Sequence, residues 1–330
     1  MKLILFCLII LPLFSVAQQT ATINVTPNLN SVAEYQKIVA SADGKSIFLI
    51  GKKEKELVTL KNDGIYWKNI PVKNVLNYID DALIQTQGYV WAYNYHKVYS
   101  DLFTLGSDFY WHDYKLREKF GIPITAMGTS KKDDILLAGK IYDRGTAYAA
   151  SYSNAWTPKW TFLTAKKSQP EIDQLFETNT ISKITGGYKE NVFVELQQPD
   201  HTTIIIFWNG KQWKQVSEKL NSVAQSMVVD GKGNLFLSGN YTTAAGEDCL
   251  LKWNGKKWAE IVVEGFLKGS PKTLIVDENN LLLVGGNVTD GYKIVEGNGT
   301  NGWQVFGSAP MCNGQMVYNG TSIFLMGIDH

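Results

Sequence analysis

The sequence predicts an all-β fold made of small repeated sheets, and three observations carry the prediction. A glycine-containing strand recurs through the chain, as in residues 231–240 (GKGNLFLSGN) and 278–287 (ENNLLLVGGN). A hairpin ending in tryptophan recurs with it, and no convincing long amphipathic helical pattern interrupts the series. Four short strands in every 40 to 50 residues are typical of a β-propeller, in which twisted sheets pack face to face around a channel.

The recurring strand consists of a turn, three or four apolar residues and a glycine position. Its seven copies place Gly51, Tyr93, Gly139, Leu196, Gly239, Gly285 and Gly327 at that position, 42 to 57 residues apart. Seven copies predict seven blades, and six complete blades with a terminal appendage are the alternative. The last copy ends at His330 after two strands, so we expect residues 22–26 (TINVT) to supply an outer strand and close the ring.

The recurring hairpin is clearest in residues 207–213 (FWNGKQW) and 251–258 (LKWNGKKW). Asn-Gly between apolar runs favours a type I′ turn, in which both central residues have positive φ. If Asn209 and Gly210 form that turn, Trp208 lies opposite Lys211, Ile206 lies opposite Trp213, and the two indoles are diagonal neighbours on one face. Six hairpins end in tryptophan, and we expect these side chains to pack between neighbouring sheets: Trp67, Trp111, Trp160, Trp213, Trp258 and Trp303.

The first seventeen residues have the pattern of a secretory signal peptide. Lys2 precedes an apolar run from Leu3 to Phe14, and small residues follow at Ser15 and Ala17. A run of this length is too short to span a bilayer, which favours cleavage after Ala17 over a retained anchor. We therefore expect a secreted protein, at the cell surface or in the periplasm, with a single propeller domain over residues 18–330 and no membrane span after the leader is removed.

The charge balance argues against nucleic acid or anionic lipid as the main partner. The chain has 32 basic and 31 acidic residues, and loss of the leader removes one basic residue, so the mature protein is neutral. Nucleic acids and anionic membranes attract concentrated lysine and arginine, which this chain lacks. Cys249 and Cys312 remain after cleavage; they form either one disulfide or two buried free thiols.

Residues 228–261 (VVDGKGNLFLSGNYTTAAGEDCLLKWNGKKWAEI) resemble a family of secreted bacterial propeller repeats. These run from a strand and a glycine through a Thr-Thr-Ala-rich loop to a Trp-Asn-Gly hairpin, and are loosely related to kelch and galactose-oxidase-like propellers. The resemblance is partial around Trp208 and Trp303 and only periodic elsewhere. It implies an exported propeller and no particular reaction. Residues 281–286 (LLLVGG) look kelch-like, but the other copies keep one glycine or none.

The longer loops after each glycine position should share one face of the propeller with the connections between blades. Loops on a rigid scaffold are where binding residues collect. Aromatic rings with nearby carboxylates suit sugar rings, sugar hydroxyls or peptide segments, whereas ordinary solvated loops are the alternative. The candidate ligand-binding residues of these loops are Tyr93, Tyr95, His96, Tyr142, Asp143, Arg144, Asp200, His201, Tyr241, Asp248, Asp290 and Tyr292.

Residues 167–180 (KSQPEIDQLFETNT) are the one segment for which we expect a helix. Ser168 is a potential cap, Pro170 suits the first turn, and Ile172, Leu175 and Phe176 share one side. The helix is either a surface insertion, which we favour because longer loops cost little, or a lid over the channel.

The inventory of residues excludes several enzyme classes. A sialidase-type site needs three arginines, and the chain contains only Arg117 and Arg144. The four histidines lack ligand-like spacing, and no nucleophile elbow, zinc helix, EF-hand loop or phosphate loop is present. We therefore expect no metal, no cofactor and no catalytic residue that the spacing can select.

The sequence leaves three hypotheses for function. The first is a non-catalytic propeller that binds a glycan or a protein partner at the cell envelope. The second is a carbohydrate-active enzyme, a polysaccharide lyase or glycoside hydrolase, with a carboxylate pair or a Tyr/His base among the loop residues. The third is a structural assembly module. Oligomeric state is not determined by any of these patterns.

Overall fold

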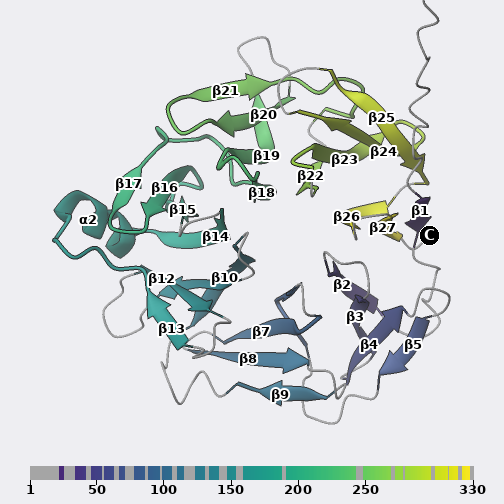
Figure 1. Ribbon diagram of the computed structural model, residues 1–330, viewed down its shortest axis with the longest axis horizontal. Helices are drawn as coiled ribbons and strands as arrows, with labels where there is room; N and C mark the ends of the chain where they lie inside the picture. The colour runs from purple at the N-terminus through teal and green to yellow at the C-terminus, as the bar shows by residue number, and fades with distance from the viewer. Residues whose placement is uncertain are drawn as a thin grey trace, which may run out of the picture.

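The computed structural model shows an all-β propeller, with small sheets arranged around a central space (Figure 1). It describes residues 22–25, 34–41, 46–53, 56–62, 67–70, 78–85, 88–96, 99–105, 110–114, 123–130, 134–140, 147–153, 159–187, 191–242, 248–268, 272–277, 279–298, 302–310, 312–318 and 322–327. The predicted signal peptide, residues 1–17, lies outside the described residues. Within the described part of the chain, no helix has the length and apolarity needed to span a bilayer.

Six sheets have four antiparallel strands each, ordered from the channel outward as they occur in the chain. Blade 1 contains β2 (Glu34–Ala40), β3 (Ile47–Lys53), β4 (Glu56–Asn62) and β5 (Trp67–Ile70). Blade 2 contains β6 (Asp81–Ile84), β7 (Val90–His96), β8 (Tyr99–Leu105) and β9 (Trp111–Asp113). Blade 3 contains β10 (Ile124–Thr129), β11 (Ile135–Lys140), β12 (Ala147–Ser153) and β13 (Lys159–Phe162).

The second half of the chain repeats this order. Blade 4 contains β14 (Thr180–Gly186), β15 (Asn191–Gln197), β16 (Thr203–Asn209) and β17 (Trp213–Gln215). Blade 5 contains β18 (Ser226–Val229), β19 (Leu235–Thr242), β20 (Asp248–Trp253) and β21 (Trp258–Ile261). Blade 6 contains β22 (Lys272–Val276), β23 (Leu282–Val288), β24 (Gly291–Gly297) and β25 (Gln304–Ala309).

The remaining place in the ring holds a three-stranded terminal sheet with the order β1-β27-β26. It combines β1 (Thr22–Val25) with β26 (Cys312–Tyr318) and β27 (Ser322–Gly327), and β1 pairs with β27 in parallel register from Thr22↔Ser322 to Val25↔Leu325. The N-terminal strand therefore joins the two ends of the chain as predicted. The prediction of seven blades is not supported, because six sheets are complete in the described part of the chain and the terminal sheet has three strands; the alternative, six blades with additional terminal strands, describes the molecule.

The tryptophan hairpins differ from the predicted type I′ turns. Trp208 lies directly opposite Trp213, and Trp253 directly opposite Trp258, with ring centroids 5.2 and 5.7 Å apart. Four residues therefore form each turn, and only the glycine adopts positive φ, 85° at Gly210. The asparagine acts through its side chain instead, since Asn209 Oδ1 accepts the N–H groups of the two residues before Trp213 at 3.0 Å each.

The hairpin tryptophans join neighbouring blades, as the sequence predicts. Trp213 Nε1 donates to the carbonyl of Leu163 at 2.8 Å, and Trp258 Nε1 donates to the carbonyl of Val216 at 2.6 Å. Each acceptor stands three residues after the tryptophan that ends the preceding blade, so the same contact occurs between blades 3 and 4 and between blades 4 and 5. Trp111, which is fully buried, reaches the preceding blade through Thr59 Oγ1 at 3.3 Å.

Helix α2 (Pro170–Thr178) lies on the outer edge of blade 4 and not over the channel (Figure 1). Phe176 packs edge-on against Trp213 with ring centroids 5.3 Å apart, and the Gln169 side chain bonds both backbone groups of Trp213. The surface-insertion prediction is therefore confirmed and the lid is wrong. Ser168 does not cap the helix, because its hydroxyl bonds the Asp173 carboxylate.

The inner strands are joined by a different kind of contact, in which a polar side chain of one sheet bonds the backbone of the next. Ser226 Oγ of β18 accepts the Leu274 N–H of β22 at 3.2 Å, and Thr125 Oγ1 of β10 donates to the Ile181 carbonyl of β14 at 2.6 Å. Gln315 of the terminal sheet accepts the N–H of Ile38 and donates to the carbonyl of Gln36. We call these contacts the inner belt; they place polar side chains beside the channel.

Candidate ligand site at the mouth of the channel

The inner strands all begin at the same face of the propeller, which we call the upper face. The β7–β8 connection of blade 2 lies on this face, because β6 runs away from it and β7 returns. The turn at Gly88 and Tyr89, between β6 and β7, lies on the opposite, lower face. Blade 2 thus presents the end of β7, the start of β8 and the chain before β6 on the upper face.

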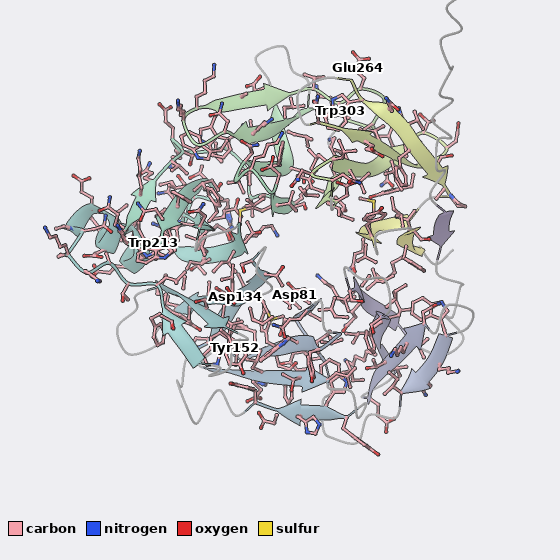
Figure 2. The ribbon with its side chains drawn as sticks, viewed as in Figure 1. Asp81, Asp134, Tyr152, Trp213, Glu264 and Trp303 are labelled. Atoms are coloured by element: carbon pink, nitrogen blue, oxygen red, sulfur yellow. The ribbon has the colours of Figure 1, made fainter. Side chains whose placement is uncertain are left out.

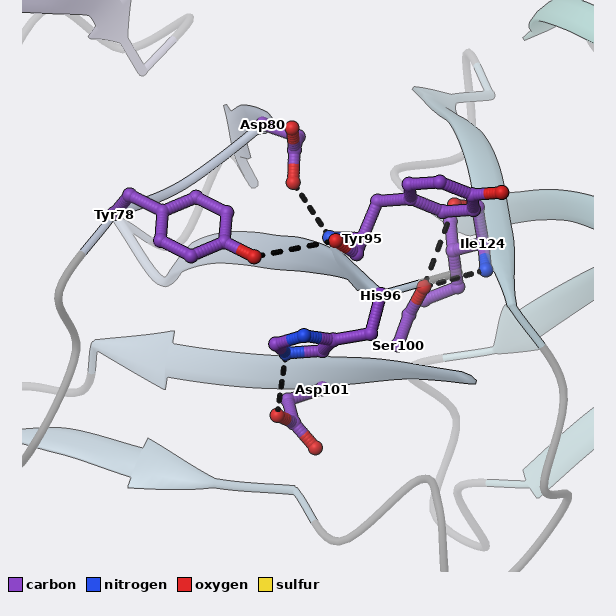
Figure 3. Close-up of polar contacts among 7 residues, drawn as sticks. All are labelled: Tyr78, Asp80, Tyr95, His96, Ser100, Asp101 and Ile124. Atoms are coloured by element: carbon purple, nitrogen blue, oxygen red, sulfur yellow. Dashed lines mark hydrogen bonds and ion pairs between the residues drawn. The ribbon is translucent and has the colours of Figure 1, made fainter. Parts of the chain in front are cut away.

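Five side chains of blade 2 form an upper-face cluster: Tyr78, Asp80, Tyr95, His96 and Asp101 (Figure 3). The Tyr78 hydroxyl donates to the Tyr95 carbonyl at 3.2 Å, and the Tyr95 N–H donates to the Asp80 carboxylate at 2.5 Å. His96 Nε2 lies 3.2 Å from Asp101 Oδ2, and the Tyr78 ring meets the His96 ring edge-on at 6.2 Å. These contacts hold the end of β7 in place.

Tyr95 is the most accessible ring of the cluster, with 42% of its surface exposed. In Figure 3 its side chain extends away from Tyr78 and His96, so the ring is not enclosed by its neighbours. Asp80 is exposed and His96 is half-buried. The cluster therefore offers an open aromatic ring beside carboxylates.

A mouth cavity of about 320 Å³ adjoins the cluster at the start of the inner strands. Tyr93 and Asp80 connect the two, because both line the cavity and Asp80 also bonds Tyr95. Figure 2 shows Asp81 beside the central space. The lining residues are Asp80, Asp81, Tyr93, Thr125, Ala126, Met127, Ser182, Lys183, Ile184, Gln225, Ser226 and Met227.

Charge and burial determine the ion pairing of Asp81 and the protonation of Tyr93 at the mouth cavity. Asp81 Oδ1 lies 2.5 Å from Lys37 Nζ, with both side chains about one-third exposed. Burial raises the pKa of Tyr93, and the negative charges of Asp81 and Asp80 raise it further. Tyr93 therefore keeps its proton at neutral pH and is a hydrogen-bond donor and acceptor at the cavity wall.

A deeper cavity of about 520 Å³ occupies the channel below, and it shares Gln225 and Ser226 with the mouth cavity. Its apolar lining comes mainly from β2, β6 and β26, and its polar lining from β18 and β22 with Lys37 and Gln315. The two cavities therefore adjoin each other at Gln225 and Ser226. The described lining of the channel contains both polar and apolar residues.

The structure brings together three of the predicted binding residues, Tyr93, Tyr95 and His96, all on β7. Asp200 and His201 lie in the β15–β16 turn of blade 4, away from the blade 2 cluster. The Lys219 side chain and the Thr202 hydroxyl and N–H lower the pKa of Asp200, so its carboxylate is ionised and held by its own turn. His201 is exposed and has a φ of 65°.

The other predicted residues have several placements. Asp290 is exposed in the β23–β24 turn. Tyr292 is fully buried and packs with Leu283 and Met316, so it belongs to the core and not to a binding surface. The structure does not describe Tyr142, Asp143 and Arg144. It places Tyr241 in β19 and Asp248 in β20 but does not describe their side chains. The side chains of Cys249 and Cys312 are also outside the description.

Sequence reasoning missed the site residues that stand at the starts of inner strands: Lys37, Asp80, Asp81, Lys183 and Lys272. The available signal was strand direction, because every inner strand enters the channel from the same face. A polar residue just inside each inner strand was therefore as good a candidate as a loop residue. Among the described residues, no group of three His, Cys, Asp or Glu side chains is arranged to hold a metal ion.

Comparison with known proteins supports the fold. The sequence matches no protein-family model and no curated protein. The structure is similar to virginiamycin B lyase from Staphylococcus aureus, with a TM-score of 0.54, 11% identity, and coverage of 84% of this chain and 85% of that one. It is also similar to U3-55K, with a TM-score of 0.56, 8% identity, and coverage of 87% and 86%.

A weaker similarity is to SapL1 lectin in complex with α-methyl fucoside, with a TM-score of 0.49, 15% identity, and coverage of 85% and 96%. At these identities the likeness concerns the fold alone. The chain is an all-β propeller, and membership of a secreted bacterial repeat family stays a prediction.

Proposed function

We propose that this chain is a non-catalytic propeller, exported to the cell envelope, that binds a glycan at the mouth of its channel. The observation that carries the proposal is the exposed Tyr95 ring on a strand end whose backbone N–H bonds Asp80, a residue that lines a polar cavity. A sugar ring has an apolar C–H face that packs on an aromatic ring and hydroxyls that bond carboxylates. The upper-face cluster and the mouth cavity offer both kinds of contact.

The fixed backbone at the end of β7 favours the hypothesis of a binding site over that of an ordinary solvated loop. Two hydrogen bonds, from Tyr78 and to Asp80, hold the two backbone groups of Tyr95, so the ring is presented from a rigid strand end. A pre-organised aromatic side chain loses little conformational freedom when a ligand binds. The size of the two adjoining cavities, about 320 and 520 Å³, suits one or two sugar residues.

Glycan-array binding followed by titration calorimetry tests the proposal. Tyr95→Ala should weaken binding of the selected glycan by at least about tenfold, as expected for loss of a stacking ring and its buried area. Tyr89→Ala is the matched control: Tyr89 is 40% exposed on the same blade but on the lower face. Equal affinity of both variants for the glycan contradicts the proposed site.

The export part of the proposal rests on residues 1–17 alone. Expression in a bacterial host, fractionation and N-terminal sequencing check it. The expected mature chain begins at Gln18 and leaves the cytoplasm. Retention of Met1 in a cytoplasmic fraction contradicts it.

One observation favours the enzyme alternative. His96 is oriented by Asp101 at 3.2 Å and lies beside Tyr78, an arrangement that a general base in a lyase or hydrolase requires. Turnover of the glycan selected above, lost in His96→Ala and retained in Tyr89→Ala, would establish this alternative. Binding without turnover supports the non-catalytic proposal.

A further inference from the structure

The deeper cavity differs from the mouth cavity in charge. Asp80, Asp81 and Lys183 line the mouth cavity, whereas the described lining of the deeper cavity contains Lys37 and Lys272 and no carboxylate. Lys272 lines the deeper cavity and is 4% exposed, so it is a buried cationic residue. Charges in such a place are screened less by salt than surface charges.

The two lysines come from sheets on either side of the terminal sheet. Lys272 begins β22 of blade 6, Lys37 lies in β2 of blade 1, and β26 with Gln315 stands between them (Figure 1). Backbone hydrogen bonds to the neighbouring side chains hold this wall: the Lys272 N–H donates to Gln225, and the Ile38 N–H donates to Gln315. The wall is therefore built from rigid inner strands.

Lys37 shows how an anion is held here, because its ammonium group already binds the Asp81 carboxylate. Asp81 lies at the boundary between the mouth and the deeper cavity, so a ligand anion entering from the mouth meets Lys37 first. The lining also includes the apolar residues Val39, Leu83 and Met316, from β2, β6 and β26, which suit the C–H face of a sugar ring. The cavity thus combines two cationic residues with an apolar wall made of these three residues.

We infer that the deeper cavity takes an acidic sugar residue, whose anionic group lies at Lys37 and Lys272 while its C–H face lies on the apolar wall. This inference rests on the proposed function and names the ligand class, a glycan carrying a carboxylate or a phosphate. Because the two cavities adjoin at Gln225 and Ser226, the same glycan can continue to Asp80 and Tyr95.

Titration calorimetry of the full mature chain with glucuronic acid, glucose and glucose 6-phosphate tests the inference. Glucuronic acid should bind at least about tenfold more tightly than glucose, because a close charge pair is worth about 1.5 kcal/mol or more. The preference should fall as salt rises, but less steeply than for an exposed pair. A phosphate sugar that outranks glucuronic acid assigns the anionic group to a phosphate; the reverse order assigns it to a carboxylate.

Two variants and a control locate the effect. Lys272→Met should reduce the preference for glucuronic acid over glucose to within about twofold. The double variant Lys37→Met with Asp81→Asn should do the same. It replaces both members of the Lys37–Asp81 ion pair, so that no unpaired carboxylate remains. Lys214→Met, on the exposed outer strand β17, is the control and should keep the preference. Thermal unfolding of each variant shows whether it is folded; if Lys272→Met is not, the double variant decides.

The outcomes separate this inference from the proposed function. Equal binding of glucuronic acid and glucose by the wild type, or a preference that survives in every folded variant, overturns the inference. Tyr95-dependent binding of neutral glycans with no acid preference leaves the proposed function standing alone. An acid preference that depends on Lys272 but not on Tyr95 supports the anion-binding cavity and removes the proposed upper-face site.

Discussion

The outer and inner strands of this propeller join neighbouring sheets by different means. On the outside, a tryptophan repeats the same contact, as Trp213 does with Leu163 and Trp258 with Val216. On the inside, residues of different types connect the sheets, since Ser226, Thr125 and Gln315 each bond the backbone of the next sheet. Figure 2 shows Trp213 and Trp303 toward the outside and Asp81 beside the central space.

The difference teaches where function can arise in a repeated fold. The outer contact needs a large flat side chain with one donor, so one residue type recurs and little chemistry is left over. The inner contact needs only one polar atom near a strand, so serine, threonine, glutamine or a carboxylate suffices. Inner positions are therefore free to diverge, and the charged groups at the channel mouth are part of that divergence.

The largest expected effect is at the outer strands. Trp213→Ala should lower the free energy of unfolding by about 3–5 kcal/mol, because it removes a buried indole that packs on Trp208 and Phe176 and donates to Leu163. Trp258→Ala should cost less, because Trp258 is only half-buried. Urea unfolding measures both; equal losses would show that burial does not set the strength of the outer contact.

The next effect concerns Glu195, which extends the inner belt from blade 4 to blade 5. Its fully buried carboxylate accepts the Ser182 hydroxyl and the Ala224 N–H, each at 2.7 Å. Glu195→Ala should cost about 2–3 kcal/mol, because both donors lose their acceptor inside the protein. A loss below about 0.5 kcal/mol would mean that the inner belt does not hold the sheets together.

Glu195 also predicts a pH dependence. Burial raises its pKa above the ordinary value, although the Ser182 and Ala224 hydrogen bonds oppose the shift. Near pH 4 the unfolded chain keeps this proton largely bound; as pH rises, the unfolded state releases it first, so this group lowers stability until the folded state also ionises. Glu195→Gln should therefore gain stability relative to the wild type as pH rises from about 4. A difference that is constant with pH contradicts the shift.

A smaller effect is expected where the belt closes the ring. Gln315→Ala removes the partner of the Ile38 N–H and of the Gln36 carbonyl, and should cost about 1–2 kcal/mol. Gln212→Ala, at an exposed turn, is the control and should change stability by less than about 0.5 kcal/mol. If the two variants match, ring closure depends on the β1–β27 pairing and not on the belt.

The smallest effects belong to the hairpin turns. Asn209→Ala and Asn254→Ala each remove an acceptor of two N–H groups at 3.0 Å, so each should cost about 0.5–1 kcal/mol by urea unfolding. The two values should agree because the contacts are the same. Unequal values would show that the outer repeat is less uniform than its geometry.

Much of the fold could be predicted because its signals are local. The glycine strand, the Trp-Asn-Gly hairpin and the helix over residues 170–178 each appear within a few residues of sequence, where periodicity and turn chemistry act. The turn type was wrong because the Asn209 side chain, and not its φ, makes the turn. The predicted number of blades was not supported because the terminal sheet has three strands in the described part of the chain.

Less of the candidate site could be predicted. Tyr93, Tyr95 and His96 were found because they stand together on one strand end. Tyr292 was misplaced because β24 begins at Gly291. Asp290 lies in the exposed turn before this strand, whereas Tyr292, two residues later, is already in the core. Lys37 and Lys272 were missed because the candidates were taken from the loops, whereas a lysine in an inner strand is recognised only from the order and direction of the strands in each blade.

The sequence by itself determined that this chain is built from repeated strand-and-turn units with tryptophan-ended hairpins, because each unit is specified by residues close in the chain. Only the tertiary structure decided which polar groups share the channel. Lys37 and Lys272 are far apart in sequence and become neighbours of the same cavity because the ring closes between blades 6 and 1. Closure is a long-range event, and no local pattern encodes which side chains it brings together.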